Sequence, residues 1–266
     1  MNIGILSKRT TMLTGKIKEY YETNGYNVTI YTLENLIINE ILFKNDFYIL
    51  KSKSLFFLYA GFFLNENDIP VIPNPYFSFL QKNRLQSHFL IQKAGLLAPI
   101  MYYGTPEMLI EQLESDIFPL ILKPVVGSGS RGVKIISSFQ DLKREDKKIL
   151  YLEKFINGIH YTVYFIGEQI CTLIKPPLSD EHVKMEKIKT PKDIKDIIKK
   201  WKLVLGVNQL FGHLDIVRSE SDNELFVVDP GSFPEFSNWK CGNSTVKKIC
   251  DLILNQVEKI KNTPKN

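Results

Sequence analysis

The sequence predicts a mixed α/β protein, in which a small parallel α/β domain precedes an α+β region built on antiparallel hairpins. Up to residue 78, short apolar runs alternate with stretches of helical spacing, which is typical of a parallel sheet covered by helices. Residues 117–136 hold two β-rich runs on either side of a Gly/Ser turn. Residues 212–236 hold two apolar runs, joined by a polar turn, that each contain an aspartate.

The first 78 residues are expected to form one domain. An apolar run predicts a buried strand, and Leu13, Ile17 and Tyr21 then share one side of a helix that should end at Gly25. The expected strands cover residues 3–6, 28–33, 46–51 and 70–72, and the expected helices cover residues 11–24 and 55–65. Layers of this kind are common, so they indicate a fold class and no function.

The composition is that of an ordinary globular chain, with 266 residues, 44% of them hydrophobic and 24% charged. The net charge of +5 is mild and the lysines are scattered, which disfavours nucleic acid and suits a small polyanion. The longest apolar run, at residues 54–64, is too short for a membrane span. Cys171, Cys241 and Cys250 show no CxxC spacing, so we expect reduced thiols in a soluble, cytoplasmic protein.

The turn after Lys123 predicts a phosphate-binding loop. Glycines allow backbone N–H groups to close around an anion, serine hydroxyls add donors, and the lysine at the strand end supplies a positive charge. The small residues of this turn are Gly127, Ser128, Gly129 and Ser130. The lysine precedes the glycines and no helical pattern follows, so this is not a P-loop of the Walker type. A glycine-rich hairpin without a ligand is the alternative.

The two aspartates near the C-terminus predict a metal site. If their strands pair as an antiparallel hairpin, Asp215 and Asp229 lie close together, where two carboxylates repel unless a cation lies between them. Oxygen ligands suit Mg²⁺, which typically takes one or two carboxylates together with substrate phosphates. The alternative is that both are turn or cap carboxylates.

Together, four segments in this order resemble the ATP-grasp superfamily, and most closely its RimK-like (ribosomal-protein glutamate-ligase-like) and inositol-phosphate-kinase-like members. The Lys-Pro and Gly/Ser hairpin resembles the loop that covers the phosphates. Residues 83–99 resemble the family's D-K…A-G…P helix, with Asn83-Arg84 in place of Asp-Lys. Residues 153–158 resemble the hinge between the two lobes, and the aspartate strands resemble the family's metal strands.

The resemblance implies a domain order and a nucleotide site. Residues 1–78 would form the preceding α/β domain and residues 79–266 a two-lobed ATP-grasp fold, with a lid at about 98–155 and a metal and substrate part at about 156–266. The cofactors implied are ATP and Mg²⁺, with Mn²⁺ as an alternative. The residues implied for nucleotide binding are Arg84, Lys123, Gly127, Ser128, Gly129, Ser130, Glu153, Lys154, Phe155, Ile156 and His160. A surface arginine and a plain strand histidine are the alternatives for Arg84 and His160.

The resemblance also implies catalytic residues and shows one departure. Lys123 would contact the transferred phosphate, and His213 stands where related ligases carry an arginine that faces the developing oxyanion. Asp215 and Asp229 would hold the metal. The asparagine expected two residues after the second acid is Gly231 here, so one oxygen ligand is missing and the second ion should bind weakly, recruit Ser232 or water, or be absent.

The activity implied is that of an ATP-dependent ligase, which converts a carboxylate into an acylphosphate that an amine or a thiol then attacks. The expected partners are small-molecule or peptide carboxylates and amines, and a homodimer is compatible with this function. Two alternatives stay open: a small-molecule kinase on the same fold, and an ATP-binding protein with impaired catalysis. The substrate contacts are expected in the least patterned loops, around residues 7–15 and 175–190.

Overall fold

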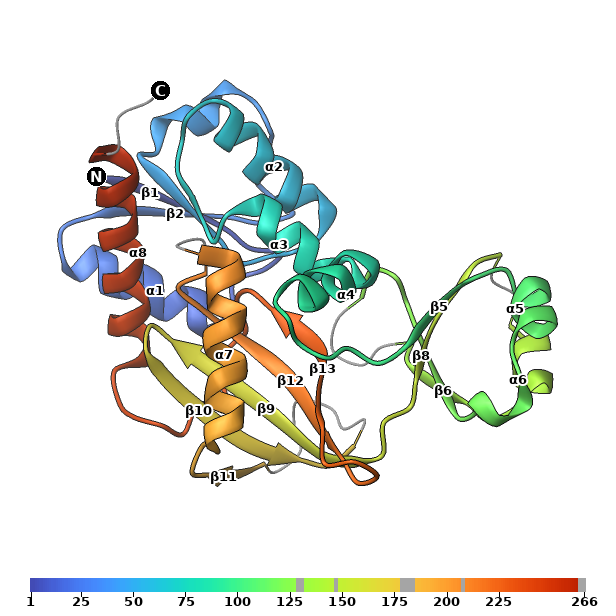
Figure 1. The fold of residues 1–266 in the computed structure, drawn as a ribbon. Helices are drawn as coiled ribbons and strands as arrows, with labels where there is room; N and C mark the ends of the chain where they lie inside the picture. The colour runs from blue at the N-terminus through green and yellow to red at the C-terminus, as the bar shows by residue number, and fades with distance from the viewer. Residues whose placement is uncertain (128–131, 146–147, 178–184, 207–208, 263–266) are drawn as a thin grey trace.

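The protein contains three β-sheets that follow one another along the chain (Figure 1). The computed structural model describes residues 1–127, 132–145, 148–177, 185–206 and 209–262. The first and third sheets make up the body of the molecule, and the second sheet projects from it. The predicted α/β class, with a parallel sheet followed by antiparallel ones, is confirmed.

The first sheet is parallel, with the strand order β2-β1-β3-β4. Its strands are β1 (Asn2–Leu6), β2 (Asn27–Tyr31), β3 (Phe47–Leu50) and β4 (Val71–Ile72), and its helices are α1 (Met12–Thr23), η1 (Glu40–Lys44) and α2 (Leu55–Glu66). All the strands and helices predicted here are present, with small differences at their ends. Thr11 caps α1 by accepting a hydrogen bond from the Thr14 amide, and Gly25 follows the helix with a positive φ.

Two helices connect this sheet to the projecting part: α3 (Pro75–Lys82) and α4 (Arg84–Lys93). Asn83 ends the first and caps the second, where its side chain accepts a hydrogen bond from the Gln86 amide. Gly95 has a φ of 64° just after α4, a conformation that commonly ends a helix at glycine. The expected domain boundaries stay predictions.

The second sheet is antiparallel, with the order β5-β8-β6-β7. Its strands are β5 (Met101–Gly104), β6 (Leu120–Lys123), β7 (Lys134–Ile136) and β8 (Leu150–Lys154). It carries α5 (Pro106–Gln112), η2 (Ser115–Ile117) and α6 (Phe139–Lys143) around a small core of its own. The two strands predicted on either side of the Gly/Ser turn are therefore present as β6 and β7.

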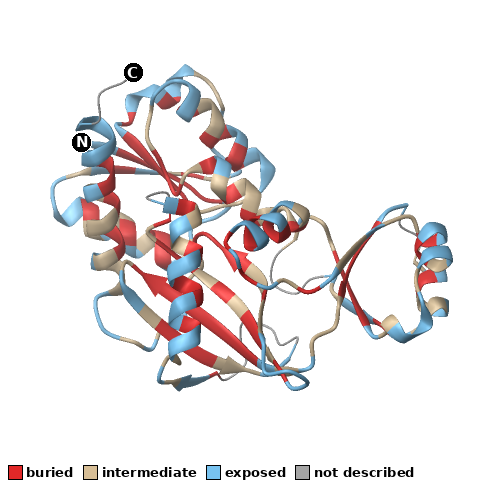
Figure 2. Ribbon diagram, in the orientation of Figure 1, coloured by how far each residue is buried: buried red, intermediate tan, exposed pale blue. Residues whose placement is uncertain are grey.

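The third sheet is also antiparallel, with the order β11-β10-β9-β12-β13. Its strands are β9 (Gly158–Ile166), β10 (Gln169–Lys175), β11 (Glu186–Ile188), β12 (Phe211–Ser219) and β13 (Leu225–Gly231), and α7 (Lys192–Leu205) and α8 (Thr245–Asn262) complete the chain. One core cluster joins this sheet to the first sheet, α1 and α8, and a second one joins it to α4 and α7. Figure 2 shows these buried strands at the centre of the body.

One sequence-based expectation in this region was wrong. We expected reduced thiols, but Cys171 on β10 and Cys241 form a disulfide with their Cα atoms 5.5 Å apart, because the fold brings together residues 70 positions apart. Pro191 stands at the start of α7, and the preceding Thr190 accepts a hydrogen bond at its hydroxyl from the Thr172 hydroxyl.

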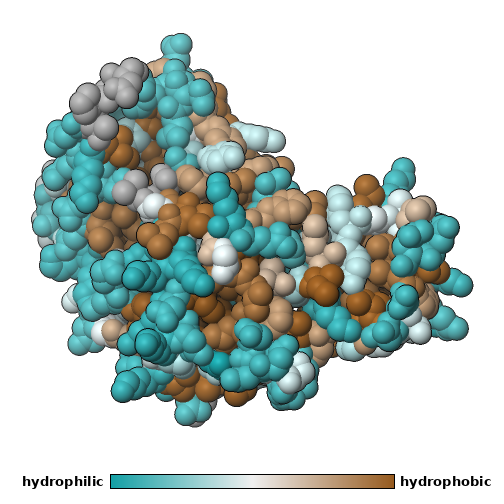
Figure 3. Space-filling view, in the orientation of Figure 1, coloured by the Kyte–Doolittle hydropathy of each residue, from teal (hydrophilic) through white to brown (hydrophobic). Residues whose placement is uncertain are grey.

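The surface in the view of Figure 3 is mainly hydrophilic, with hydrophobic residues gathered toward the middle of this face. Within the described ranges, we find no helix with both the length and the apolar character that a membrane crossing requires.

Candidate active site

Two cavities meet beside β12 and β13. The larger, of about 610 Å³, lies between the first and third sheets at the carboxyl ends of β1 and β3, where ligand sites of open α/β sheets usually form. The smaller, of about 80 Å³, lies between the second and third sheets. Lys175, Asp215 and Asp229 line both cavities. The predicted metal residues thus stand where the two cavities join.

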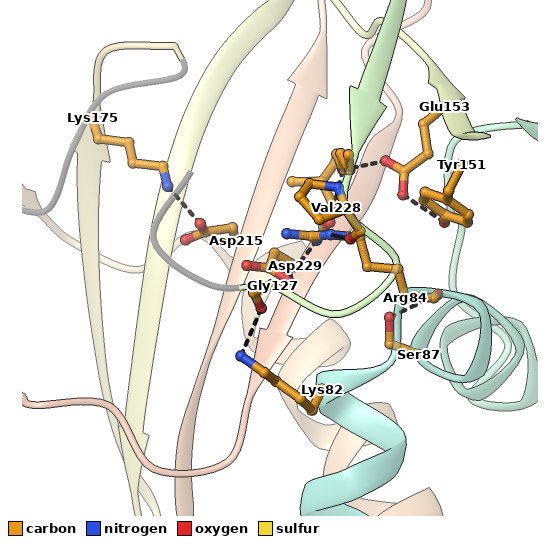
Figure 4. Close-up of polar contacts among 12 residues, drawn as sticks. Lys82, Arg84, Ser87, Gly127, Tyr151, Glu153, Lys175, Asp215, Val228 and Asp229 are labelled. Atoms are coloured by element: carbon orange, nitrogen blue, oxygen red, sulfur yellow. Dashed lines mark hydrogen bonds and ion pairs between the residues drawn. The ribbon is translucent and has the colours of Figure 1, made fainter. Parts of the chain in front are cut away.

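A buried ion pair between Lys123 and Glu153 lines the smaller cavity, and Figure 4 labels Glu153 and its neighbour Tyr151. The two residues are 7% and 5% exposed, and they lie at the ends of the neighbouring strands β6 and β8. The Tyr151 hydroxyl donates to Glu153 Oε1 at 2.7 Å, and Lys123 Nζ also donates to the Val228 carbonyl at 3.3 Å. The fold therefore brings two of the predicted nucleotide residues together, with their charges matched to each other.

Arg84 links the start of α4, the Gly/Ser loop and the metal strand. It is 6% exposed, its Nη1 donates to Asp229 Oδ1 at 3.0 Å, and its Nε donates to the Pro124 carbonyl at 3.1 Å. The reading of Arg84 as a plain surface residue was therefore wrong. Nearby, Lys82 Nζ donates to the Gly127 carbonyl at 3.0 Å. Ser128, Gly129 and Ser130 lie outside the described residues.

Asp215 and Asp229 face each other across β12 and β13, as the antiparallel hairpin required. Asp215 accepts hydrogen bonds from Thr162 Oγ1 at 2.8 Å and from Lys175 Nζ at 2.5 Å. Burial by itself would raise the pKa of the Asp215 carboxyl, but the Lys175 charge and these hydrogen bonds hold that pKa below its ordinary value. Asp215 is thus a carboxylate at neutral pH.

His213 completes a cluster of potential metal ligands with the two aspartates. One ligand atom from each of these three residues lies within 4.8 Å of the other two. Burial lowers the pKa of the His213 imidazole, so the ring is neutral at pH 7, which is the form that binds metal ions. The Nδ1 atom of His213 is buried without a hydrogen-bond partner.

The His213 ring fills the space that a side chain at position 231 would occupy. His213 is the residue that pairs with Gly231 across the two strands. A Cβ atom added at position 231 would overlap Cε1 of the His213 ring and would stand 2.5 Å from Nδ1. Gly231 is not one of the glycines with positive φ, so the ring, and not the backbone, accounts for a glycine here.

Of the remaining residues predicted to bind the nucleotide, three line the smaller cavity and Phe155 is not among its lining residues. Lys154, Ile156 and His160 line the smaller cavity, whereas the Phe155 amide donates to the Pro119 carbonyl at 3.1 Å. The Nε2 atom of His160 is buried without a partner, and burial lowers the pKa of its imidazole. Lys154 Nζ is held by the Ile117 carbonyl at 2.6 Å.

Comparison with protein families matches residues 83–213 to the ATP-grasp domain. This protein contains an ATP-grasp domain. Solved structures extend the fold likeness over almost the whole chain. The ATP-grasp ligase PsnB, in complex with a minimal precursor, Mg and ADP, has 15% identity and a TM-score of 0.69, over 96% of this chain and 98% of that one.

Two more ATP-grasp structures share the fold. The RimK domain ATP-grasp protein of Sphaerobacter thermophilus has 12% identity and a TM-score of 0.78, over 95% of this chain and 99% of that one. D-alanine–D-alanine ligase of Bacillus anthracis, in complex with ATP, has 18% identity and a TM-score of 0.72, and both chains are fully covered, at 100% each. An uncharacterized protein of Sinorhizobium fredii is 26% identical over 101 residues, and the match spans 33% of this chain but only 21% of that protein.

Sequence reasoning did not single out Lys8, Lys51 or Lys175, although Lys8 and Lys175 fall within the loops where substrate contacts were expected, around residues 7–15 and 175–190. Lys175 ends β10, and Lys8 and Lys51 follow β1 and β3. A lysine at the end of an apolar strand, as in Lys123, was the signal that could have found Lys51 and Lys175. Their approach to Asp215 and to the cavity depends on strand register, which the sequence does not show.

Proposed function

We propose that this ATP-grasp protein is an ATP-dependent ligase, which activates a carboxylate as an acylphosphate and transfers the acyl group to an amine or a thiol. The observation that carries this proposal is the junction of the two cavities at Lys175, Asp215 and Asp229. We assign the nucleotide to the smaller cavity, which at about 80 Å³ would have to open to admit ATP, and the acceptor to the larger one, so that a phosphoryl group would pass between them where cation-binding groups gather.

The smaller cavity supports nucleotide binding. Lys123 and Arg84 bring positive charge to it from β6 and α4, and His160 presents an imidazole with an unpartnered nitrogen. Lys123 would bind the phosphates once ATP draws it from Glu153, and Glu153 would then be available to the adenine amine or a ribose hydroxyl. Without a nucleotide, the ion pair between Lys123 and Glu153 would keep either buried charge from being left unpaired.

The two aspartates fit a divalent cation. Each of them already contacts a positive group, since Lys175 binds Asp215 and Arg84 binds Asp229. The site is therefore built to hold positive charge beside phosphates. Asp215 and Asp229 would hold Mg²⁺ or Mn²⁺, which when bound would neutralise the charge of the phosphate oxygens.

The larger cavity supports an anionic acceptor. Five lysines line it, namely Lys8, Lys51, Lys53, Lys82 and Lys175. Lys51 is held by Glu235 at 2.7 Å, which places its ammonium group at the wall. Such a lining favours a small-molecule or peptide carboxylate. The PsnB structure bound to its precursor peptide makes peptides reasonable substrates to test first.

The chemistry divides into two balanced steps. A carboxylate oxygen of the acceptor attacks the γ-phosphorus, the bond from that phosphorus to the bridging oxygen breaks, and ADP leaves. The amine nitrogen then attacks the acyl carbon, the acyl carbon–oxygen bond breaks, and phosphate leaves with the proton of the amine. Lys123, Arg84 and Lys175 would orient the phosphates and offset their charge, while the second sheet would exclude water.

Nucleotide release in the presence of acceptors tests this function. Release of ADP that requires both a carboxylate and an amine or thiol, screened over panels of amino acids and peptides, supports the ligase. Release with an alcohol acceptor alone would instead indicate the kinase, and ATP binding without turnover would indicate impaired catalysis. The cytoplasmic location and the homodimer stay predictions.

A further inference from the structure

We propose that His213 is itself a metal ligand, so that the cation is held by a His–Asp–Asp centre rather than by oxygen ligands alone. The proposal deepens the proposed function, because the same ion would serve ATP, but metal binding can be measured without ATP or turnover. From the sequence, we expected His213 to face the developing oxyanion and one metal ligand to be missing at Gly231.

The first support is the geometry of β12 and β13. His213 and Asp215 are two residues apart on one strand, so their side chains emerge on the same face of the sheet. Asp229 faces Asp215 from the neighbouring strand. A nitrogen and two carboxylate oxygens lie within 4.8 Å of one another, and ligands that share an ion at about 2.1 Å lie at most about 4.2 Å apart. Small side-chain movements would therefore close the site.

The second support is that the His213 ring occupies the volume of a side chain at position 231. A nitrogen ligand therefore stands where an oxygen ligand was expected. The imidazole nitrogen of His213 therefore replaces the missing oxygen ligand as a metal ligand. Glycine at position 231 makes this possible, because a side chain there would overlap the ring.

The third support is that His213 Nδ1 is buried without any hydrogen-bond partner. A buried polar nitrogen that binds nothing costs free energy, and most such atoms in proteins are satisfied. A cation at the cluster would bind the imidazole directly and give the ring a partner. No group in the described part of the protein hydrogen-bonds to this nitrogen.

The nitrogen ligand has a consequence for metal choice. Mg²⁺ demands near-octahedral oxygen ligation, whereas first-row transition ions accept imidazole and bind mixed sites more tightly toward Co²⁺. We therefore expect the centre to prefer Mn²⁺ and Co²⁺ to Mg²⁺, and the preference to weaken when the imidazole is replaced by a carboxamide.

The direct test is electron spin echo envelope modulation of Mn²⁺ added alone to the full-length protein. The parent should show the coupling of a directly bound ¹⁴N, which should change to that of ¹⁵N when the protein is made with ¹⁵N-labelled histidine. The coupling should be lost in His213→Asn and kept in His160→Asn, which removes the other unpartnered imidazole near the site. No nitrogen coupling in the parent, no Mn²⁺ bound at millimolar concentration, or coupling that survives in His213→Asn would overturn the proposal.

A second variant avoids changing the ligand. Gly231→Ala places a methyl group against the His213 ring, so the imidazole must move away from the aspartates. We expect Mn²⁺ affinity, measured by calorimetry on protein shown to be folded by circular dichroism, to fall at least about tenfold. Unchanged affinity would contradict the proposal. Nitrogen coupling without any ligase activity would leave this centre in place and reject the proposed function, and activity without nitrogen coupling would do the reverse.

Discussion

The imidazole ring of His213 lies against Gly231 on the neighbouring strand, in the space that any side chain at position 231 would need. These two positions therefore constrain each other. The effect of Gly231→Asn, which restores the asparagine of the family pattern, therefore depends on the residue at position 213.

The first prediction concerns this pair. Gly231→Asn alone should lower the free energy of unfolding by about 1–3 kcal/mol, because overpacking forces neighbouring groups from their positions. In the His213→Ala background the same substitution should cost little, since the ring is gone. Chemical denaturation of the four proteins in this cycle measures the coupling. Additive effects of the two substitutions would show that the ring and residue 231 do not compete for the same space.

The second prediction concerns Lys123. Lys123→Ala leaves Glu153 as a buried, unpaired carboxylate, which should cost about 3–5 kcal/mol of stability and weaken ATP binding strongly. The control is Lys134→Ala on the adjoining strand β7, where the lysine is exposed and pairs with Glu145 at 2.7 Å. Denaturation and calorimetry compare the two variants. Equal nucleotide affinities in both would remove Lys123 from the phosphate site.

The third prediction concerns Lys175, whose ammonium group binds Asp215. Lys175→Met frees a carboxylate at the metal cluster, so Mn²⁺ added without nucleotide should raise the melting temperature more in this variant than in the parent. Lys202→Met is the control, because Lys202 lies on α7 and pairs with the exposed Glu168, which is not one of the three residues of the metal cluster. The same metal-induced shift in all three proteins would argue against competition between Lys175 and the ion.

The fourth prediction concerns ATP. A ligand that binds only the native state adds RT ln(1 + [L]/Kd) to stability, about 2.7 kcal/mol at a hundredfold excess over Kd. ATP with Mn²⁺ or Mg²⁺ should therefore raise the melting temperature by several degrees. Thermal melts with ATP, with the metal and with both separate the contributions. A melt that millimolar ATP and metal leave unchanged would be incompatible with the nucleotide site described here.

The fifth prediction concerns the disulfide between Cys171 and Cys241. It closes a long segment, so its reduction should lower the free energy of unfolding by about 2–4 kcal/mol. Burial raises the pKa of the Cys250 thiol to about 12, so this third cysteine should stay unreactive until the protein unfolds. Thiol titration of the denatured, unreduced protein should find one free thiol, and three would show that the disulfide does not form.

The sequence by itself determined the secondary-structure elements and the order of the motifs, because those depend on neighbours within a few positions. The Gly25 helix end and the antiparallel strands on either side of the Gly/Ser loop were predicted from local patterns and are present. Apolar strands that each carry one acid were enough to place Asp215 opposite Asp229, since a short turn fixes which strands pair.

Only the tertiary structure decided the partners of the charged and bulky side chains. Lys175 reaches Asp215 through the register of β9, β10 and β12, and Arg84 reaches Asp229 from a helix far away in the chain. The sequence gives the residue type at each position, but not which distant residue it meets. Gly231 looked like a missing ligand for this reason: the side chain that fills its space belongs to His213, and close packing across the sheet, not sequence spacing, brings the two together.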